Sequence, residues 1–83
     1  MKNERRPEGY GTSDINIAAL LLTIEGTSFL RLEGEEDQRL FVLNGNSDIL
    51  ESKKNDWFKG QKVIGDVREF VEHRKYLLRL LKR

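Results

Sequence analysis

Cysteine is absent from this chain of 83 residues, and histidine, proline, tryptophan and methionine occur once each. Without cysteine the chain forms no disulfide and no thiolate metal site, and nothing points to an oxidising compartment. No apolar run approaches the roughly 20 residues that a membrane-spanning helix needs. The charged start, MKNERRPEG, lacks the apolar centre of a signal peptide. We therefore expect a cytoplasmic protein with no membrane partner.

Strong net charge is lacking too, but the charge is unevenly distributed. The formal net charge is +1. Residues 1–58 carry seven Lys/Arg and eleven Asp/Glu, a net of −4, whereas residues 59–83 carry eight Lys/Arg and three Asp/Glu, a net of +5. The last third is a candidate surface for an anionic partner, although helix C-termini favour cations in any case.

The clearest fold signal lies in the middle of the chain. Two apolar runs, residues 29–32 and 40–43, flank an acidic break at 34–37 that contains a glycine, which is the pattern of a β-hairpin. A period of two predicts that one face of this hairpin belongs to the core and carries Leu30, Leu32, Leu40 and Val42. The other face then carries Phe29, Arg31, Glu33, Arg39, Phe41 and Leu43. This second face is either covered by a helix or open as a binding surface.

The sequence on both sides of the hairpin predicts helices. The first begins after Thr12 or Ser13 as N-cap and ends before Gly26. The second covers residues 48–59, with Asn46 or Ser47 as its cap and few apolar residues. The third follows an Asp66 cap and runs to the C-terminus. Residues 62–65 form a short third strand or an extended connector.

Together these elements predict an α+β fold in two layers. An antiparallel hairpin packs against helices, in the order α-β-β-α-(β)-α. Residues 1–11 contain Pro7 and two glycines, and we expect them to be a flexible N-terminal arm. Residues 12–83 are expected to form a single domain.

The order of several short motifs resembles a known family. Thr12-Ser13-Asp14 precedes Ala18-Ala19-Leu20-Leu21, an apolar hairpin follows, and Trp57-Phe58-x-Gly60 leads into a last helix rich in leucine and arginine. This order is similar to that of small prokaryotic and phage-associated proteins classed as a domain of unknown function. The resemblance covers about residues 10–81. It implies a bacterial, archaeal or viral setting near mobile elements, and it brings neither catalytic residues nor a substrate.

Enzymatic residues are sparse. The single histidine, His73, stands at helical spacing from Glu69 and Tyr76, a set that can do acid–base work but also arises without function on a helix surface. The acidic hairpin turn resembles an oxygen-rich cation site or is simply solvated. Its acidic residues are Glu33, Glu35, Glu36 and Asp37. No glycine-rich phosphate loop is present. We expect a non-enzymatic binding protein with no cofactor, metal or small-molecule substrate.

Two sets of residues favour nucleic acid as the partner. One face of the last helix carries Arg68, Lys75, Arg79 and Lys82, with Arg83 following. Such a stripe can lie along a phosphate backbone, or it is the solvated outer face of a terminal helix. On the hairpin, aromatic residues alternate with Arg31 and Arg39, and this pattern can stack bases or belong to the core. The first hypothesis is a DNA- or RNA-associated accessory protein of a prokaryote, virus or mobile element.

The alternative hypothesis is a dimeric protein–protein interaction module or inhibitor. Tyr76 and Leu80 lie off the main apolar stripe of the last helix, so we expect them to be exposed. With Phe29 and Phe41 they would form the interface with a protein partner or a second copy. Charge asymmetry favours the first hypothesis and the small net charge favours the second. The sequence leaves the partner, any sequence preference and the oligomeric state open.

Overall fold

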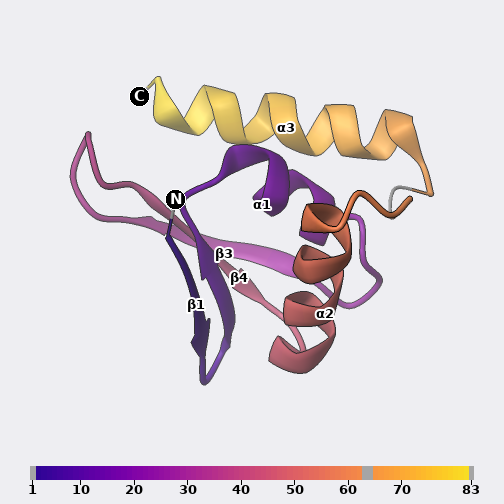
Figure 1. Ribbon diagram of the computed structural model, residues 1–83. Helices are drawn as coiled ribbons and strands as arrows, with labels where there is room; N and C mark the ends of the chain where they lie inside the picture. Colours follow the sequence, from indigo (N-terminus) through magenta and orange to yellow (C-terminus); the bar gives the residue numbers. More distant parts are fainter. Residues whose placement is uncertain (1, 63–64, 83) are drawn as a thin grey trace.

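The computed structural model describes residues 2–62 and 65–82 as a four-stranded sheet with three helices (Figure 1). The strands are β1 (Asn3–Arg6), β2 (Gly9–Thr12), β3 (Ser28–Glu33) and β4 (Leu40–Asn44). The helices are α1 (Ile15–Leu22), α2 (Ser47–Phe58) and α3 (Val67–Leu81). The predicted α+β class is confirmed, but two strands precede α1, so the predicted order of elements is not matched. The possible strand at 62–65 falls largely on residues 63–64, which lie outside the described residues.

The N-terminal segment is a β-hairpin, so the expected flexible arm is wrong for residues 3–11. β1 pairs with β2, and β2 pairs with β4, which gives an antiparallel sheet in the order β1-β2-β4-β3. Tyr10 is only 1% exposed and belongs to the core. Gly9 has a φ of +152°, and a Cβ there would lie 2.2 Å from the carbonyl oxygen of Leu43. The glycine permits a close approach of two strands rather than flexibility.

α1 lies between the sheet and α3 (Figure 1). Its six residues from Ile17 to Leu22 are all buried, because neighbours cover it on both sides. The cap is Asp14, whose Oδ1 accepts hydrogen bonds from the backbone N–H groups of Asn16 and Ile17. The predicted caps Thr12 and Ser13 precede it: Thr12 belongs to β2, and the Ser13 hydroxyl accepts from the backbone N–H of Lys2.

The two faces of the sheet differ from the prediction, and β3 contains a bulge. The register shifts between Phe29 and Arg31, and Leu30 is left 43% exposed. One extra residue reverses the alternation of side chains. The residues facing the helices are therefore Tyr10, Phe29, Leu32, Phe41 and Leu43. The helices of the described residues all lie on this side (Figure 1). Leu40 and Val42 are buried as predicted, at 6% and 0% exposed, but they lie with Arg31 on the other face, which we call the open face because none of these helices covers it.

α2 and α3 begin where the sequence predicts. The Asn46 side chain caps α2, and the Asp66 side chain accepts from the Glu69 backbone N–H at 3.2 Å to cap α3. Trp57 stacks on Phe70 with ring centroids 6.4 Å apart, which anchors the end of α2 to α3. The centre of α3 is fixed by Leu77, which is fully buried against the core.

Candidate nucleic-acid interface

The outer face of α3 carries a row of cations that we call the basic stripe: Arg68, Lys75, Arg79 and Lys82. All four are exposed. Their spacing of seven, four and three residues keeps them on one side of the helix, over roughly 21 Å of its length. The opposite side of α3 packs on α1, through Leu77 and through Arg74, whose Nε donates to Asn16 Oδ1 at 2.8 Å. Arg83, predicted to extend the stripe, lies outside the described residues.

The stripe is largely free of internal ion pairs. Lys75 Nζ lies 3.9 Å from the Glu72 carboxylate, one turn away on the same face. Within residues 2–62 and 65–82, Arg68, Arg79 and Lys82 have no carboxylate within 4.0 Å. These side chains therefore present their charge to solvent, where a polyanion can reach them.

The open face of the sheet carries the opposite arrangement, an ion network of Glu4, Arg6, Glu8, Arg31 and Glu33. Arg6 contacts Glu4 and Glu33, each at 2.9 Å. Arg31 contacts Glu33 at 2.6 Å and Glu8 at 2.7 Å. Hydrogen bonds from Arg31 hold the pKa values of Glu8 and Glu33 below their ordinary range. Every charged group in this network thus has a partner of opposite sign within the protein.

The predicted base-stacking surface on the hairpin is not assembled. Phe29 and Phe41 face the helices, Arg31 is held in the ion network of the open face, and Arg39 lies in the loop before β4. The β3 bulge and the burial of both phenylalanines separate residues that a regular hairpin would align. Arg31 and Phe41 consequently drop out as candidates for contact with bases, while Arg39 stays available.

The predicted protein interface is also dispersed. Phe41 is 2% exposed, Phe29 and Leu80 pack against the core, and Tyr76 alone of the four keeps a broadly exposed side chain, at 46%. The Tyr76 ring meets Phe29 edge to face, with centroids 6.0 Å apart and planes at 79°. The interaction-module hypothesis stays a prediction, with a smaller surface than the sequence suggested.

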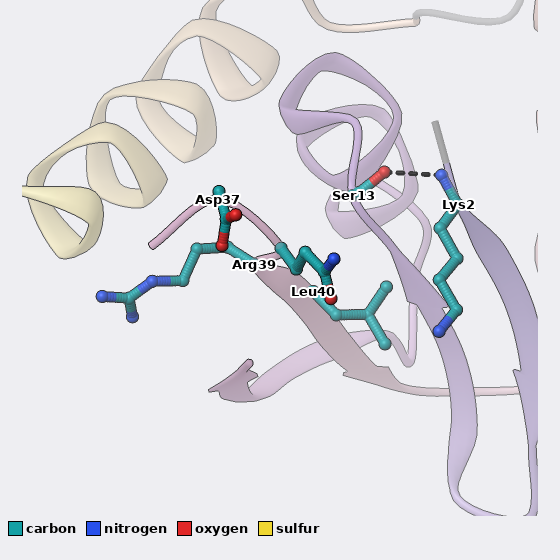
Figure 2. A pocket seen from close by; sticks show the side chains of 6 residues that line it. Lys2, Ser13, Asp37, Arg39 and Leu40 are labelled. Atoms are coloured by element: carbon teal, nitrogen blue, oxygen red, sulfur yellow. Dashed lines mark hydrogen bonds between the residues drawn. The ribbon is translucent and has the colours of Figure 1, made fainter. Parts of the chain in front are cut away.

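A groove that sequence reasoning missed lies between the β3–β4 loop and the start of α1 (Figure 2). It consists of two hollows of about 420 and 390 Å³ that share Ser13, Asp37, Gln38 and Arg39. Lys2 and Leu40 line the first hollow, and the second extends to Leu81 at the end of α3. Residues from both ends of the chain build this groove, so no local sequence pattern announces it.

A buried tyrosine, Tyr10, links β2 to α2. Burial and the neighbouring Glu51 carboxylate raise the pKa of Tyr10. Hydrogen bonding from the Tyr10 hydroxyl, and then from Lys54, lowers the pKa of Glu51. The Tyr10 phenol therefore stays protonated and acts as a hydrogen-bond donor that holds α2 against the sheet.

Two other candidate sites from the sequence are the acid–base set around His73 and a metal site. His73 Nε2 lies 3.5 Å from Glu69 Oε1, but the Tyr76 ring contacts Phe29. In the described part of the chain, no three His, Asp or Glu residues are grouped to hold a metal ion. None of its helices combines the length and apolarity needed to cross a membrane.

Comparison with known proteins found no relative of this chain. No protein-family model matches the sequence, and neither a curated protein nor a solved structure is significantly similar to it. The resemblance to phage-associated domains of unknown function stays a prediction from the sequence motifs. Function is therefore argued from the arrangement of charge.

Proposed function

We propose that the protein is a non-enzymatic, nucleic-acid-associated accessory protein that lays the basic stripe of α3 along a phosphate backbone. The observation that carries this proposal is the contrast in pairing. On the sheet, Arg6 and Arg31 are paired with carboxylates at 2.6–2.9 Å, whereas three of the four stripe cations have no carboxylate partner among the described residues. Cations left unpaired in a row suit a partner with evenly spaced negative charge.

The position of α3 supports this mode of binding. α3 is the outermost helix and rests on α1 (Figure 1), with its basic stripe on the side away from α1, so a rod-like polyanion can approach it without any rearrangement. Residues 1–58 carry a net charge of −4, which repels a polyanion from the rest of the surface. Attraction at one face and repulsion elsewhere orient the encounter.

Salt-dependent binding tests the proposal. Fluorescence anisotropy with labelled duplex DNA, single-stranded DNA and RNA is measured at 50 and 200 mM salt. Four phosphate contacts predict a slope of log affinity against log salt of about −3 to −4. Lys75→Glu/Arg79→Glu should weaken binding at least tenfold at the lower salt and flatten the slope, because it turns two attractive charges into repulsive ones.

The matched control makes the same change of charge on α2 and its C-cap residue. Lys53→Glu/Lys59→Glu leaves the stripe intact, so it should weaken binding by much less than the α3 pair. Equal losses in the two variants would show that net charge alone matters. No binding of the unaltered protein to any of the three probes at 50 mM salt would overturn the proposal.

A further inference from the structure

The two outer edges of the sheet differ in composition. The strand order β1-β2-β4-β3 makes β1 and β3 the edge strands. β1 has four residues, NERR, and three of them are charged, which is one way in which natural sheets keep an edge from pairing. β3 has six residues, SFLRLE, and three of them are apolar. Among the described residues no strand pairs with the outer side of β3, so its backbone is open to another strand.

Exposed apolar side chains lie along the β3 edge. Leu30, at the bulge, is 43% exposed, and Tyr76 of α3 is 46% exposed. The Tyr76 ring contacts Phe29 of β3 edge to face, with ring centroids 6.0 Å apart. Phe29 and Leu32 pack against the core but are only partly buried. The edge therefore combines unpaired backbone groups with apolar surface, the combination that favours strand addition.

The bulge determines which pairing with a second β3 is possible. The register with β4 places Phe29 and Leu32 on the helix side of the sheet, and Ser28, Arg31 and Glu33 on the open face. Directly opposed residues of antiparallel strands point to the same face. Of the antiparallel registers that pair at least five of the six residues of β3 with a second copy, only one keeps like faces together. It sets Phe29 opposite Leu32 of the second copy.

This match depends on the bulge. In a regular strand Phe29 and Leu32, three positions apart, would point to opposite faces, and the extra residue brings them to the same one. By symmetry the Phe29–Leu32 contact occurs twice. The Tyr76 ring, which lies on Phe29, then also lies beside Leu32 of the second copy.

The charges of β3 suit the same register. Arg31 stands opposite Leu30 of the second copy, and the Glu33 carboxylate stands opposite the Ser28 hydroxyl, which can donate to it. Arg31 and Glu33 keep their own ion pair at 2.6 Å within each chain. A shift by one residue to a pairing centred on Arg31 would oppose two arginines, which is destabilising. The edge is therefore complementary to itself in one register.

We infer that the outer edge of β3 binds the same edge of a second copy of this chain, antiparallel and about a two-fold axis, with Phe29 opposite Leu32. The two sheets then form one continuous sheet with the helices of both copies on one side. A contact of two short strands lies at the small end of protein interfaces, so we expect a weak, reversible dimer. The inference uses no residue of the basic stripe and does not rest on the proposed function.

The absence of cysteine allows the register to be tested by crosslinking. Ser28→Cys and Glu33→Cys are prepared as separate proteins, mixed at high concentration and oxidised. In the inferred register position 28 opposes position 33, so the mixture should form a disulfide-linked heterodimer. Each variant alone should stay largely uncrosslinked, because its two cysteines would lie about 17 Å apart along the strands. Crosslinking of the mixture no greater than that of the single variants would overturn the inferred register.

Sedimentation equilibrium tests the interface itself. Between about 10 μM and about 1 mM, the range of a weak association, the mass of the unaltered protein should rise toward that of a dimer. Leu30→Lys should weaken dimerisation by about tenfold or more, since it places a charge on the edge strand of both copies. Ile49→Lys is the matched control, because Ile49 is an exposed apolar residue of α2, and it should dimerise like the unaltered protein.

The remaining outcomes count against the inference. A monomeric mass at every concentration would overturn it and leave the β3 edge to a strand of another protein. Equal loss of dimer in Leu30→Lys and Ile49→Lys would show that the copies do not meet through β3. Circular dichroism of each variant checks that the fold is retained.

Discussion

Two charged surfaces of this small protein use the same side chains in opposite ways. On the open face of the sheet, Arg6 and Arg31 are each held by two carboxylates and lie over small or buried residues such as Gly11 and Val42. On α3, Arg68 and Arg79 extend from a helix whose other side is fixed to the core. A count of arginines alone would not distinguish the two surfaces. Their pairing indicates that the first is structural and the second is available to a ligand.

The largest effect is expected from filling the space under the ion network. A Cβ on Gly11 would lie 2.9 Å from Leu40 Cδ2 and 3.3 Å from Arg6 Nε. Gly11→Val should therefore lower the free energy of unfolding by about 2 kcal/mol, in the range of overpacked sites. Urea denaturation measures it. Gly65→Val is the matched control, since a Cβ there meets no atom of a described residue within 4 Å, and an equal loss in the control would contradict this prediction.

Removing one carboxylate from each surface sharpens the comparison. Glu33→Gln takes away the partner shared by Arg6 and Arg31, so it should lower the urea midpoint, though by less than Gly11→Val. Glu72→Gln should change the free energy of unfolding by no more than about 0.5 kcal/mol. It should instead tighten DNA binding a few-fold, because it removes the anion beside Lys75. The comparison fails if Glu33→Gln strengthens DNA binding as much as Glu72→Gln does.

The smallest effect is expected in the dependence of stability on pH. The folded-state pKa values of Glu8 and Glu33 are lowered, chiefly by Arg31, from an ordinary value of 4.5. Their stabilisation is present above that value and is lost as the pH falls below it, through the folded-state pKa values. Arg31→Gln should reduce the difference in stability between pH 6 and pH 3, measured by urea denaturation. Arg68→Gln should retain the full difference, and an equal reduction there would argue against the network.

Local signals in the sequence predicted the helical part of the fold well. Asn46 and Asp66 are caps by simple side-chain chemistry, and the basic stripe follows from helical spacing, so neither depends on distant residues. The N-terminal hairpin was missed because Gly9 and Gly11 indicate flexibility by composition. In the structure they allow β2 to approach β4, and Tyr10 supplies the burial.

The remaining errors arise from tertiary context. A bulge at Leu30 cannot be read from a period-two pattern, and it places Phe29 and Leu32 on the same face of β3. The groove joins Lys2, Arg39 and Leu81, which only the complete topology brings together. The position of α1 between the sheet and α3 buries Ile17 to Leu22 on every side, and no local pattern in the sequence reveals this.

The burial of α1 also separates the parts of the chain that can change from those that cannot. α1 must satisfy the sheet and α3 at once, so almost every substitution there disturbs two contacts. The outer side of α3 touches neither layer. Substitutions in the basic stripe can therefore change the charge of this surface while the scaffold stays the same. The proposed recognition surface and the residues that determine the fold therefore lie at separate positions in the chain.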